Sequence, residues 1–262
     1  MSKIEEALEK ANKLRASNVR KKTQSLNIFE RVEPREVEND YLVSLNEPNS
    51  PVAEEFRKLK SMLLRITKKD FLNTVMITSS ISGEGKTITA INLAVTIAQE
   101  IDHSILLIDA DLRRPMIHNY LGMNPKYGLS DYLLKDIDIS EILVKTGIGK
   151  MVLLPAGKTV PNPQELLSSV KMEYLIKELK QRYMDRYIII DTPPILSFAE
   201  AISIGHCVDG VIYVVKEGQT QRKAVQNGLH LLKDINVFGV IFNAVRGMNS
   251  NGYHKGTDYY AY

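Results

Sequence analysis

The stretch Ser80-Ile81-Ser82-Gly83-Glu84-Gly85-Lys86-Thr87 directly follows the apolar run 74–78 and precedes 89–98, which contains neither glycine nor proline. A strand, a glycine-containing loop and a helix in this order form a phosphate-binding loop, whose backbone N–H groups face the phosphates of a nucleotide. The lysine of such a loop reaches the β- and γ-phosphates, and the following hydroxyl binds Mg²⁺. The alternative is a coincidental Gly-Lys-Thr turn. The residues that we expect to contact the nucleotide are Ser82, Gly83, Glu84, Gly85, Lys86, Thr87 and Ile88.

One position departs from the usual pattern of such loops, G-x-x-x-x-G-K-[ST]. Ser80 stands where the first glycine is expected. The flanking strand and helix are nevertheless both present in the pattern of apolar residues. The prediction of a nucleotide site therefore rests on the whole strand–loop–helix unit rather than on the motif alone.

Composition restricts the possible classes of protein. The 262 residues, 44% of them apolar, suffice for one large α/β domain or two small ones. A single cysteine, Cys207, excludes a disulfide framework and fits a reducing cytosol. No apolar run approaches the ~20 residues needed to cross a bilayer, and the N-terminus does not resemble a signal peptide. We therefore expect any membrane association to occur through a partner or at the membrane surface.

The positive charge is concentrated at the N-terminus. Residues 1–22 hold seven basic and three acidic side chains, whereas the whole chain has a net charge of +3. A nucleic-acid-binding protein usually carries a basic face on a domain rather than a basic tip. We therefore expect no nucleic acid among the partners.

Three regions follow from the pattern of apolar residues. Residues 1–50 are predicted to form an amphipathic helix at 3–15 and then a flexible linker, 51–246 an α/β domain, and 247–262 a polar tail. The expected strands are rich in Val, Ile and Leu with little alternation, which is typical of strands covered on both faces. Because strands and helices alternate, we predict a mostly parallel central sheet flanked by helices on both faces. The predicted strands are 74–78, 105–109, 151–154, 187–191, 210–215 and 237–242, and the predicted helices between them are 88–100, 129–135, 163–182, 199–205 and 220–234.

Acidic residues follow two of the predicted strands. Asp109 and Asp111 end the run 105–108, and Asp191 ends the run 187–190. Ligands of parallel sheets bind beyond the carboxyl ends of the strands, so these carboxylates should stand beside the phosphate loop. Thr87, Asp109 and Asp191 are candidate Mg²⁺ ligands, since Mg²⁺ favours oxygen donors. One carboxylate of the pair Asp109 and Asp111 could also accept a proton from an attacking hydroxyl.

Two further residues have competing interpretations. Arg113 could neutralise charge on a transferred phosphoryl group, or Asp111 and Arg113 could simply cap the following segment. Asn243 ends the last predicted strand, and its amide could pair with a purine edge or satisfy a local turn. The sequence leaves both questions open.

Tyrosines are concentrated at the C-terminus. Four of the twelve tyrosines, Tyr253, Tyr259, Tyr260 and Tyr262, lie in the last ten residues. A flexible tail that presents several phenols could enter a phosphoryl-transfer site as a substrate. The alternative is that these rings pack on an edge or an interface.

With these motifs together, the chain resembles the bacterial tyrosine kinases (BY-kinases) that accompany exopolysaccharide or capsule export. The resemblance covers residues 51–262 and rests on the phosphate loop, Asp109-Ala110-Asp111-Leu112-Arg113, Asp191-Thr192-Pro193-Pro194, the stretches 155–157 and 161–167, and the tail tyrosines. It implies a P-loop fold of the MinD/ParA-like type, with 51–246 as the kinase domain. The resemblance also implies that Lys86, Thr87, Asp109, Asp111 and Asp191 bind ATP and Mg²⁺ and perform catalysis, with Asp109 as proton acceptor.

The resemblance also implies partners. Members of this family phosphorylate tail tyrosines of neighbouring subunits in a ring, and a transmembrane adaptor of the polysaccharide co-polymerase type activates them. For this chain the adaptor would be separate, and the protein would lie in the cytoplasm at the inner face of the plasma membrane. A phosphotyrosine phosphatase is the expected counterpart. The family's assembly motif E-x-x-R-x-x-R appears as Glu54, Arg57 and Lys60, and lysine cannot reproduce the planar fork of arginine.

Two other functions would use the same nucleotide site. A MinD/ParA-like positioning ATPase shares the three aspartates but usually carries an extra lysine early in the loop, where this chain has Ile81. The second alternative is a kinase-dead subunit that binds ATP and serves only as a scaffold for polysaccharide export. The sequence retains every acidic residue expected of an active enzyme.

Overall fold

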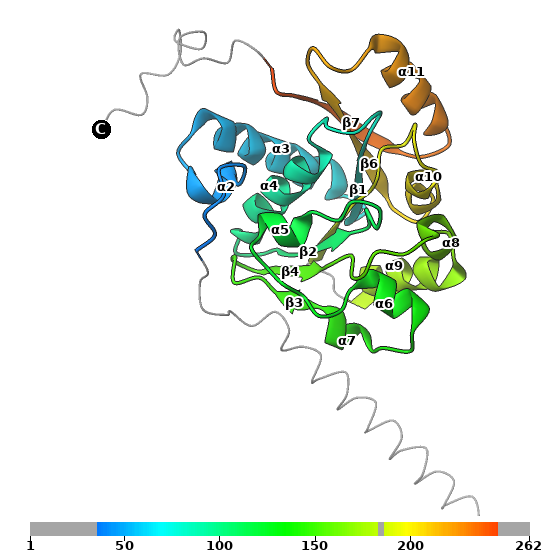
Figure 1. The fold of residues 1–262 in the computed structure, drawn as a ribbon. Coiled ribbons are helices and arrows are strands. Elements are labelled where there is room, and N and C mark those ends of the chain that lie inside the picture. The colour runs from blue at the N-terminus through cyan, green and yellow to red at the C-terminus, as the bar shows by residue number, and fades with distance from the viewer. Residues whose placement is uncertain (1–35, 183–185, 246–262) are drawn as a thin grey trace, which may run out of the picture.

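A sheet of seven strands runs through the protein in the order β3-β4-β2-β5-β1-β6-β7 (Figure 1). The structure is a computed structural model, and it describes residues 36–182 and 186–245. Neighbouring strands are parallel except β3, which pairs antiparallel with β4. This confirms the predicted architecture. The strands are β1 (Thr74–Ser79), β2 (Ser104–Asp109), β3 (Val144–Lys145), β4 (Met151–Leu154), β5 (Arg186–Asp191), β6 (Gly210–Lys216) and β7 (Val237–Asn243).

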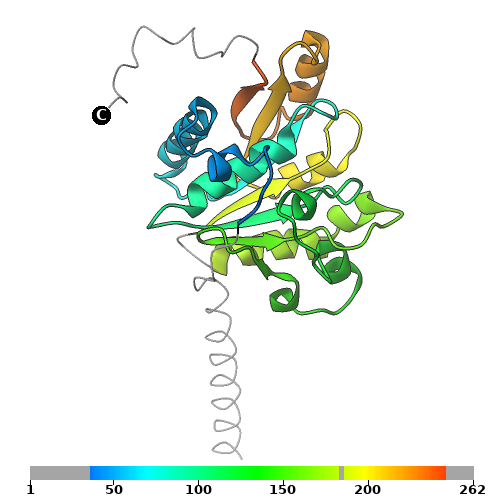
Figure 2. The same ribbon diagram turned by 60° about the vertical axis from the view of Figure 1, so that its left-hand side comes forward.

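Helices cover both faces of the sheet. Of the helices in the described part of the chain, α2, α3, α4 and α5 lie on one face, and the others lie on the opposite face (Figure 2). On the first face are α2 (Val43–Asn46), α3 (Pro51–Thr67), α4 (Lys86–Ala98) and α5 (Ile117–Tyr120). On the second face are α6 (Leu129–Leu134), α7 (Ile139–Ile142), α8 (Pro163–Leu167), α9 (Val170–Arg182), α10 (Glu200–Gly205) and α11 (Arg222–Leu231).

Successive residues of each central strand serve different hydrophobic cores. On β5, Tyr187 and Ile189 pack beneath α4, whereas Ile188 and Ile190 pack on the opposite face. All six residues of β1, β2 and β5 are buried. Burial on both faces explains why these strands read as continuous apolar runs in the sequence.

The register of the central strands aligns their carboxyl ends. Asp109 at the end of β2 pairs with Asp191 at the end of β5, and Ile77 of β1 pairs with Asp191. The phosphate loop leaves β1 two residues later. The sheet therefore brings three chain segments that lie far apart in the sequence to one edge, as the alternation of strands and helices predicts.

The structure differs from the predicted linker over residues 36–50. Leu42 is fully buried, and α2 packs on α4. Asn92 of α4 holds this segment from both sides: its Oδ1 accepts from Ser44 N at 2.9 Å, and its Nδ2 donates to Tyr41 O at 2.8 Å. We call residues 36–46 the strap. Its few apolar residues, Val37, Leu42 and Leu45, pack on the core, but they are spaced among polar residues and form no long apolar run, so the sequence suggested a linker.

The segment 163–182, predicted as one helix, is two. The break falls at Ser168 and Ser169, whose hydroxyls donate to the carbonyls of Gln164 and Leu166, both at 2.7 Å. Ser169 Oγ also accepts from Met172 N at 3.2 Å at the start of α9. Serine side chains that bind nearby backbone compete with helix continuation, which explains the interruption.

Asn92→Ala should lower the free energy of unfolding by about 2 kcal/mol, because it leaves buried backbone groups of the strap without their partner. Chemical denaturation measures this loss. Asn236→Ala is the control, since its amide donates only at an exposed site and should change stability by less than about 0.5 kcal/mol. In a chain that begins at residue 47 the effect of Asn92→Ala should shrink; an undiminished effect would show that the strap does not depend on Asn92.

Candidate active site

The phosphate loop has the backbone conformation that its glycines predict. Gly83 and Gly85 adopt φ of +85° and +90°, a left-handed region that favours glycine. Gly85 is also tightly surrounded, since a Cβ there would lie 2.1 Å from Nδ2 of Asn243. Helix α4 begins immediately afterwards at Lys86, so its first N–H groups open toward the loop.

The side chain of Ser80 explains the departure from the usual motif. Ser80 is fully buried, and its hydroxyl lies 2.9 Å from the hydroxyl of Tyr213 on β6. The Tyr213 ring in turn occupies the space beside Gly228 of α11, where a Cβ would lie 1.8 Å from the phenol oxygen. The serine is therefore part of a polar contact beneath the loop that a glycine could not make.

The segment after β6 supports the loop from outside. Thr220 donates to Glu84 Oε1, and Gln219 Nε2 donates to Ser82 O at 3.0 Å. Glu84 is fully buried and also accepts from Ile81 N at 2.6 Å. Its carboxylate thus points into the protein, and only its backbone is placed as expected for a phosphate contact. The sequence did not reveal Gln219 and Thr220, since two polar residues in a loop form no recognisable pattern.

Lys86 lies against two carboxylates. Its Nζ is 2.9 Å from Asp111 Oδ2 and 3.7 Å from Asp191 Oδ1. Thr87 Oγ1 donates to Asp191 Oδ2 at 2.7 Å. The structure therefore brings Lys86, Thr87, Asp111 and Asp191 together as the sequence predicted.

Asp109 lies deeper than its neighbours and is fully buried. Its Oδ1 accepts from Asp111 N at 3.3 Å, and its Oδ2 accepts from Ile117 N at 3.2 Å. Asp111 has two partners, since its Oδ1 accepts from Arg114 N at 3.0 Å while Oδ2 faces Lys86. One oxygen of Asp111 therefore caps the turn and the other faces Lys86, and its part in catalysis stays a prediction.

Burial and mutual repulsion raise the proton affinity of these carboxylates. Burial raises the pKa of Asp191 from 3.8 to about 6, although Lys86 and Thr87 oppose the shift. Burial also raises the pKa of Asp109 well above its usual range, and the nearby Asp191 raises it further. The pKa of Lys86 is raised as well, because the attraction of Asp191 and Asp111 outweighs its burial. The site thus holds more carboxylate charge than one ammonium group can balance.

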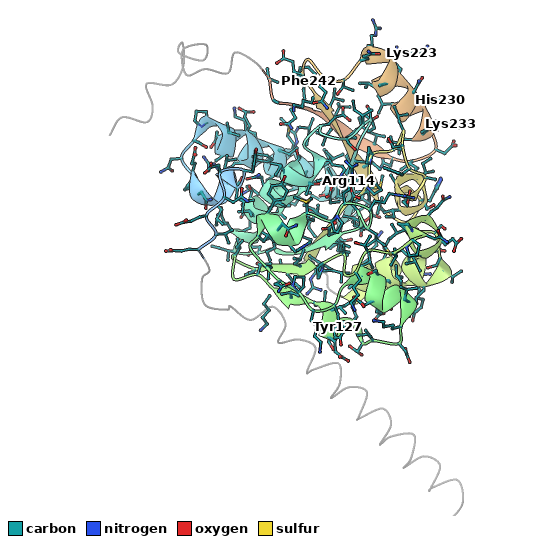
Figure 3. All side chains as sticks on the ribbon, in the orientation of Figure 1. Arg114, Tyr127, Lys223, His230, Lys233 and Phe242 are labelled. Atoms are coloured by element: carbon teal, nitrogen blue, oxygen red, sulfur yellow. The ribbon has the colours of Figure 1, made fainter. Side chains whose placement is uncertain are left out.

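Arg113 pairs with Glu200 at the start of α10. Its Nε and Nη2 both lie 2.8 Å from Glu200 Oε1, and its Cζ lies 4.3 Å from the centre of the Phe198 ring. The following residue, Arg114, lies on the same loop near the middle of the view in Figure 3. Sequence reasoning missed Phe198 and Glu200, which have no motif of their own.

Asn243 stands at the end of β7 beside the phosphate loop. Its Nδ2 donates to Glu84 O at 2.9 Å, and its Oδ1 accepts from Ala244 N at 2.9 Å. The amide therefore satisfies a local turn and the loop backbone. Its predicted contact with a purine stays a prediction.

The three residues of the assembly motif make contacts within the chain. Arg57 pairs with Glu54 at 2.6 Å and donates to Pro48 O at 2.6 Å. Lys60 pairs with Glu100, just beyond the end of α4. Their predicted role between subunits stays a prediction, as does that of the tail: Tyr253, Tyr259, Tyr260 and Tyr262 lie outside the described residues, like the helix predicted at 3–15.

None of the helices in the described ranges is long and apolar enough to cross a membrane.

The known proteins whose sequences resemble this chain include several named tyrosine-protein kinases. The family described as an AAA domain matches residues 72–239. The tyrosine-protein kinase YwqD of Bacillus subtilis (strain 168) is 36% identical over 182 residues, which cover 70% of this chain and 76% of that protein. The tyrosine-protein kinases Etk of Escherichia coli (strain K12) and Wzc of Salmonella typhi are 30% and 33% identical. These matches cover 87% and 82% of this chain, which spans only 31% and 30% of those longer proteins.

Solved structures show the same relationship. The kinase domain of the E. coli tyrosine kinase Etk superimposes with a TM-score of 0.74 at 30% identity and covers 82% of each chain. The chimerical protein CapA2B2 gives 0.72 at 28% identity, covering 85% of this chain and 97% of that one. The septum site-determining protein MinD of Pyrococcus horikoshii, complexed with Mg-ADP, gives 0.54 at 24% identity over 65% of this chain and 68% of that one, a likeness of fold alone. This chain belongs to the family of bacterial tyrosine-protein kinases.

Proposed function

We propose that this chain is an ATP-dependent protein tyrosine kinase that phosphorylates the tyrosines of its own C-terminal tail, in trans within an oligomer. The observation that carries the proposal is the arrangement of Lys86 between Asp111 and Asp191, with Thr87 bound to Asp191 at the mouth of the phosphate loop. This arrangement supports phosphoryl transfer, because it places a lysine for the phosphates and a hydroxyl–carboxylate pair for Mg²⁺ at the phosphate loop.

The donor set fits Mg²⁺. Thr87 and Asp191 offer oxygen atoms that already lie in contact, and Asp191 Oδ1 is buried with no hydrogen-bond donor on it in the described part of the chain. In those same ranges no group of three acidic, His or Cys side chains forms a complete protein cage for a metal. Mg²⁺ at nucleotide sites is held by one or two carboxylates together with substrate phosphates, so no such cage is needed. When bound, Mg²⁺ would neutralise charge on the phosphates.

The remaining residues have distinct roles in the proposed reaction. Lys86 binds the β- and γ-phosphates, and the backbone of residues 82–88 surrounds them. Asp109, which ends β2 in register with Asp191, accepts the phenol proton of the incoming tyrosine. The phenol oxygen forms a bond to the γ-phosphorus while the bond to the β-phosphate oxygen breaks, and ADP leaves with that electron pair.

We further propose that this activity regulates polymerisation and export of an exopolysaccharide or capsule at the inner face of the plasma membrane. The support is the membership of the family together with a basic N-terminal segment, 1–22, suited to a partner or a membrane surface. A separate transmembrane adaptor of the polysaccharide co-polymerase type would activate the kinase, self-association into a ring would present tails to neighbouring sites, and a phosphotyrosine phosphatase would reverse the modification.

Lys86→Met should abolish tyrosine phosphorylation in purified protein supplied with Mg²⁺-ATP, because the triphosphate loses its only lysine contact from the loop. Phosphotyrosine blotting and mass spectrometry measure the result. Lys180→Met is the matched control, since Lys180 pairs with Asp209 at the start of β6, away from the site. Phosphotyrosine that persisted in Lys86→Met would refute the kinase proposal. ATP hydrolysis by the wild type without phosphotyrosine would favour a positioning ATPase.

Deleting residues 253–262 should remove most autophosphorylation while leaving the affinity for ADP unchanged, because the nucleotide site lies wholly within the described domain. Mixing this truncated chain with full-length Lys86→Met tests action in trans: the intact tail of the inactive chain should become phosphorylated. Tyr174→Phe, which changes an exposed ring on α9, is the control. Phosphate mapped only to the core of the wild type would contradict the role of the tail.

The nucleotide-free protein should lose stability as pH rises through the range in which Asp191 ionises. Because its pKa is about 6 in the folded protein against 3.8 ordinarily, the folded state binds more protons between these values. Stability contributed by the protonated form is therefore lost on going from pH 4 to pH 7, by about 3 kcal/mol. Asp191→Asn removes this cost, so its stability relative to the wild type should increase with pH. Asp234→Asn, at an exposed site, should show no such trend. If the stability difference between Asp191→Asn and the wild type did not change with pH, the predicted cost of ionising Asp191 in the folded protein would be disproved.

A further inference from the structure

Arg113 is held in one orientation by two residues from another loop. Its Nε and Nη2 both donate to Glu200 Oε1 at 2.8 Å, and its guanidinium lies over the Phe198 ring at 4.3 Å. Two donors on one edge and an aromatic ring on one face fix both the position and the plane of a guanidinium group. Its remaining N–H groups are not used by these contacts.

The two partners differ sharply in burial. The Glu200 side chain is 1% exposed, whereas that of Arg113 is 35% exposed. A buried carboxylate needs a cationic partner, and among the described residues no donor reaches the second oxygen of Glu200. Glu200 is therefore a buried anchor for Arg113, whose own side chain stays partly exposed.

The ion pair joins the two loops that carry the site carboxylates. Arg113 follows Asp109 and Asp111 after β2, and Phe198 and Glu200 follow Asp191 after β5. The ends of these strands are in register as immediate neighbours. Arg113 thus links the segment that carries Asp109 and Asp111 to the segment that follows Asp191, because its partner Glu200 belongs to the latter.

We infer that Glu200, assisted by Phe198, is a positioning residue for phosphoryl transfer: it holds Arg113 ready to neutralise charge on the transferred phosphoryl group. This inference rests on the proposed kinase function and adds to it a residue outside the nucleotide motifs. Charged groups that are fixed before the reaction stabilise a transition state without the cost of reorganisation, whereas a free arginine on a surface loop would have to be ordered first.

Paired substitutions separate a positioning role from a purely structural one, because the two roles predict the same changes in Tm but different changes in activity. Arg113→Ala leaves a buried carboxylate without its partner and should lower Tm by about 6 °C or more. Glu200→Gln frees a half-exposed arginine and should lower Tm much less. The double variant Arg113→Ala/Glu200→Gln removes both charges and should regain most of the Tm lost in Arg113→Ala. If the pair served stability alone, activity would return with Tm.

The decisive experiment measures kcat, KM for ATP, ADP affinity and Tm for these three variants, following both phosphotyrosine formation and ATP hydrolysis with Mg²⁺-ATP. We expect Glu200→Gln to lower kcat by about tenfold or more with ADP affinity unchanged. It should lower kcat no further in the Arg113→Ala background, so the double variant should keep the low kcat of Arg113→Ala although it regains Tm. Glu200→Asp, which keeps the charge, should retain more activity than Glu200→Gln.

Asp209→Asn is the matched control, because Asp209 and Lys180 form a comparable pair of a buried acid with a half-exposed base away from the site. It should lower Tm without a specific fall in kcat. Independent losses from Arg113→Ala and Glu200→Gln, or recovery of activity in the double variant, would overturn the inference. If hydrolysis shows the coupling but the wild type forms no phosphotyrosine, the kinase proposal fails and the positioning role stands; absence of both activities overturns both.

Discussion

Lys86 faces two of three buried carboxylates, with Nζ 2.9 Å from Asp111 and 3.7 Å from Asp191. The rest of the site depends on this imbalance of charge. A single ammonium group cannot neutralise the cluster, and burial makes ionisation of Asp109 and Asp191 costly. Such a site gains free energy when a cation and a suitably placed ligand enter it. The unfavourable charge at this edge of the sheet is thus what suits the edge to the magnesium nucleotide that we propose as its ligand.

The fold tolerates this charge because the elements around it are held on every side. Asp109 and Asp191 end strands that are buried on both faces, so their backbone positions are fixed by the sheet. Helix α4, which begins at Lys86, is held by the strap through Asn92. The outer wall of the loop is held by Thr220 through Glu84. The carboxylates therefore cannot easily move apart, and their mutual repulsion persists in the folded protein.

The sequence was sufficient to predict what depends on local pattern. Apolar runs identified the six long strands, and residues 80–87, 109–113 and 191–194 identified the three segments that meet at their ends. Contacts between polar side chains remote in the sequence could not be predicted, because each partner is unremarkable alone. Glu200 lies 87 positions from Arg113 and Thr220 lies 136 positions from Glu84, and neither sits in a periodic pattern. The strap was mistaken for a linker because its backbone is held by one remote side chain, Asn92, and its apolar residues form no long run.

The segment that follows β2 connects these observations. Within four residues it directs Asp111 toward Lys86 and Arg113 toward Glu200, while Arg114 N closes the turn on Asp111 Oδ1. Alternate side chains thus engage the phosphate loop on one side and the loop after β5 on the other. A ligand that draws Lys86 away from Asp111 would loosen only one of these attachments, and Arg113 would keep its place through Glu200. In the proposed reaction, the same short turn therefore releases Lys86 to the nucleotide and still holds Arg113 in position.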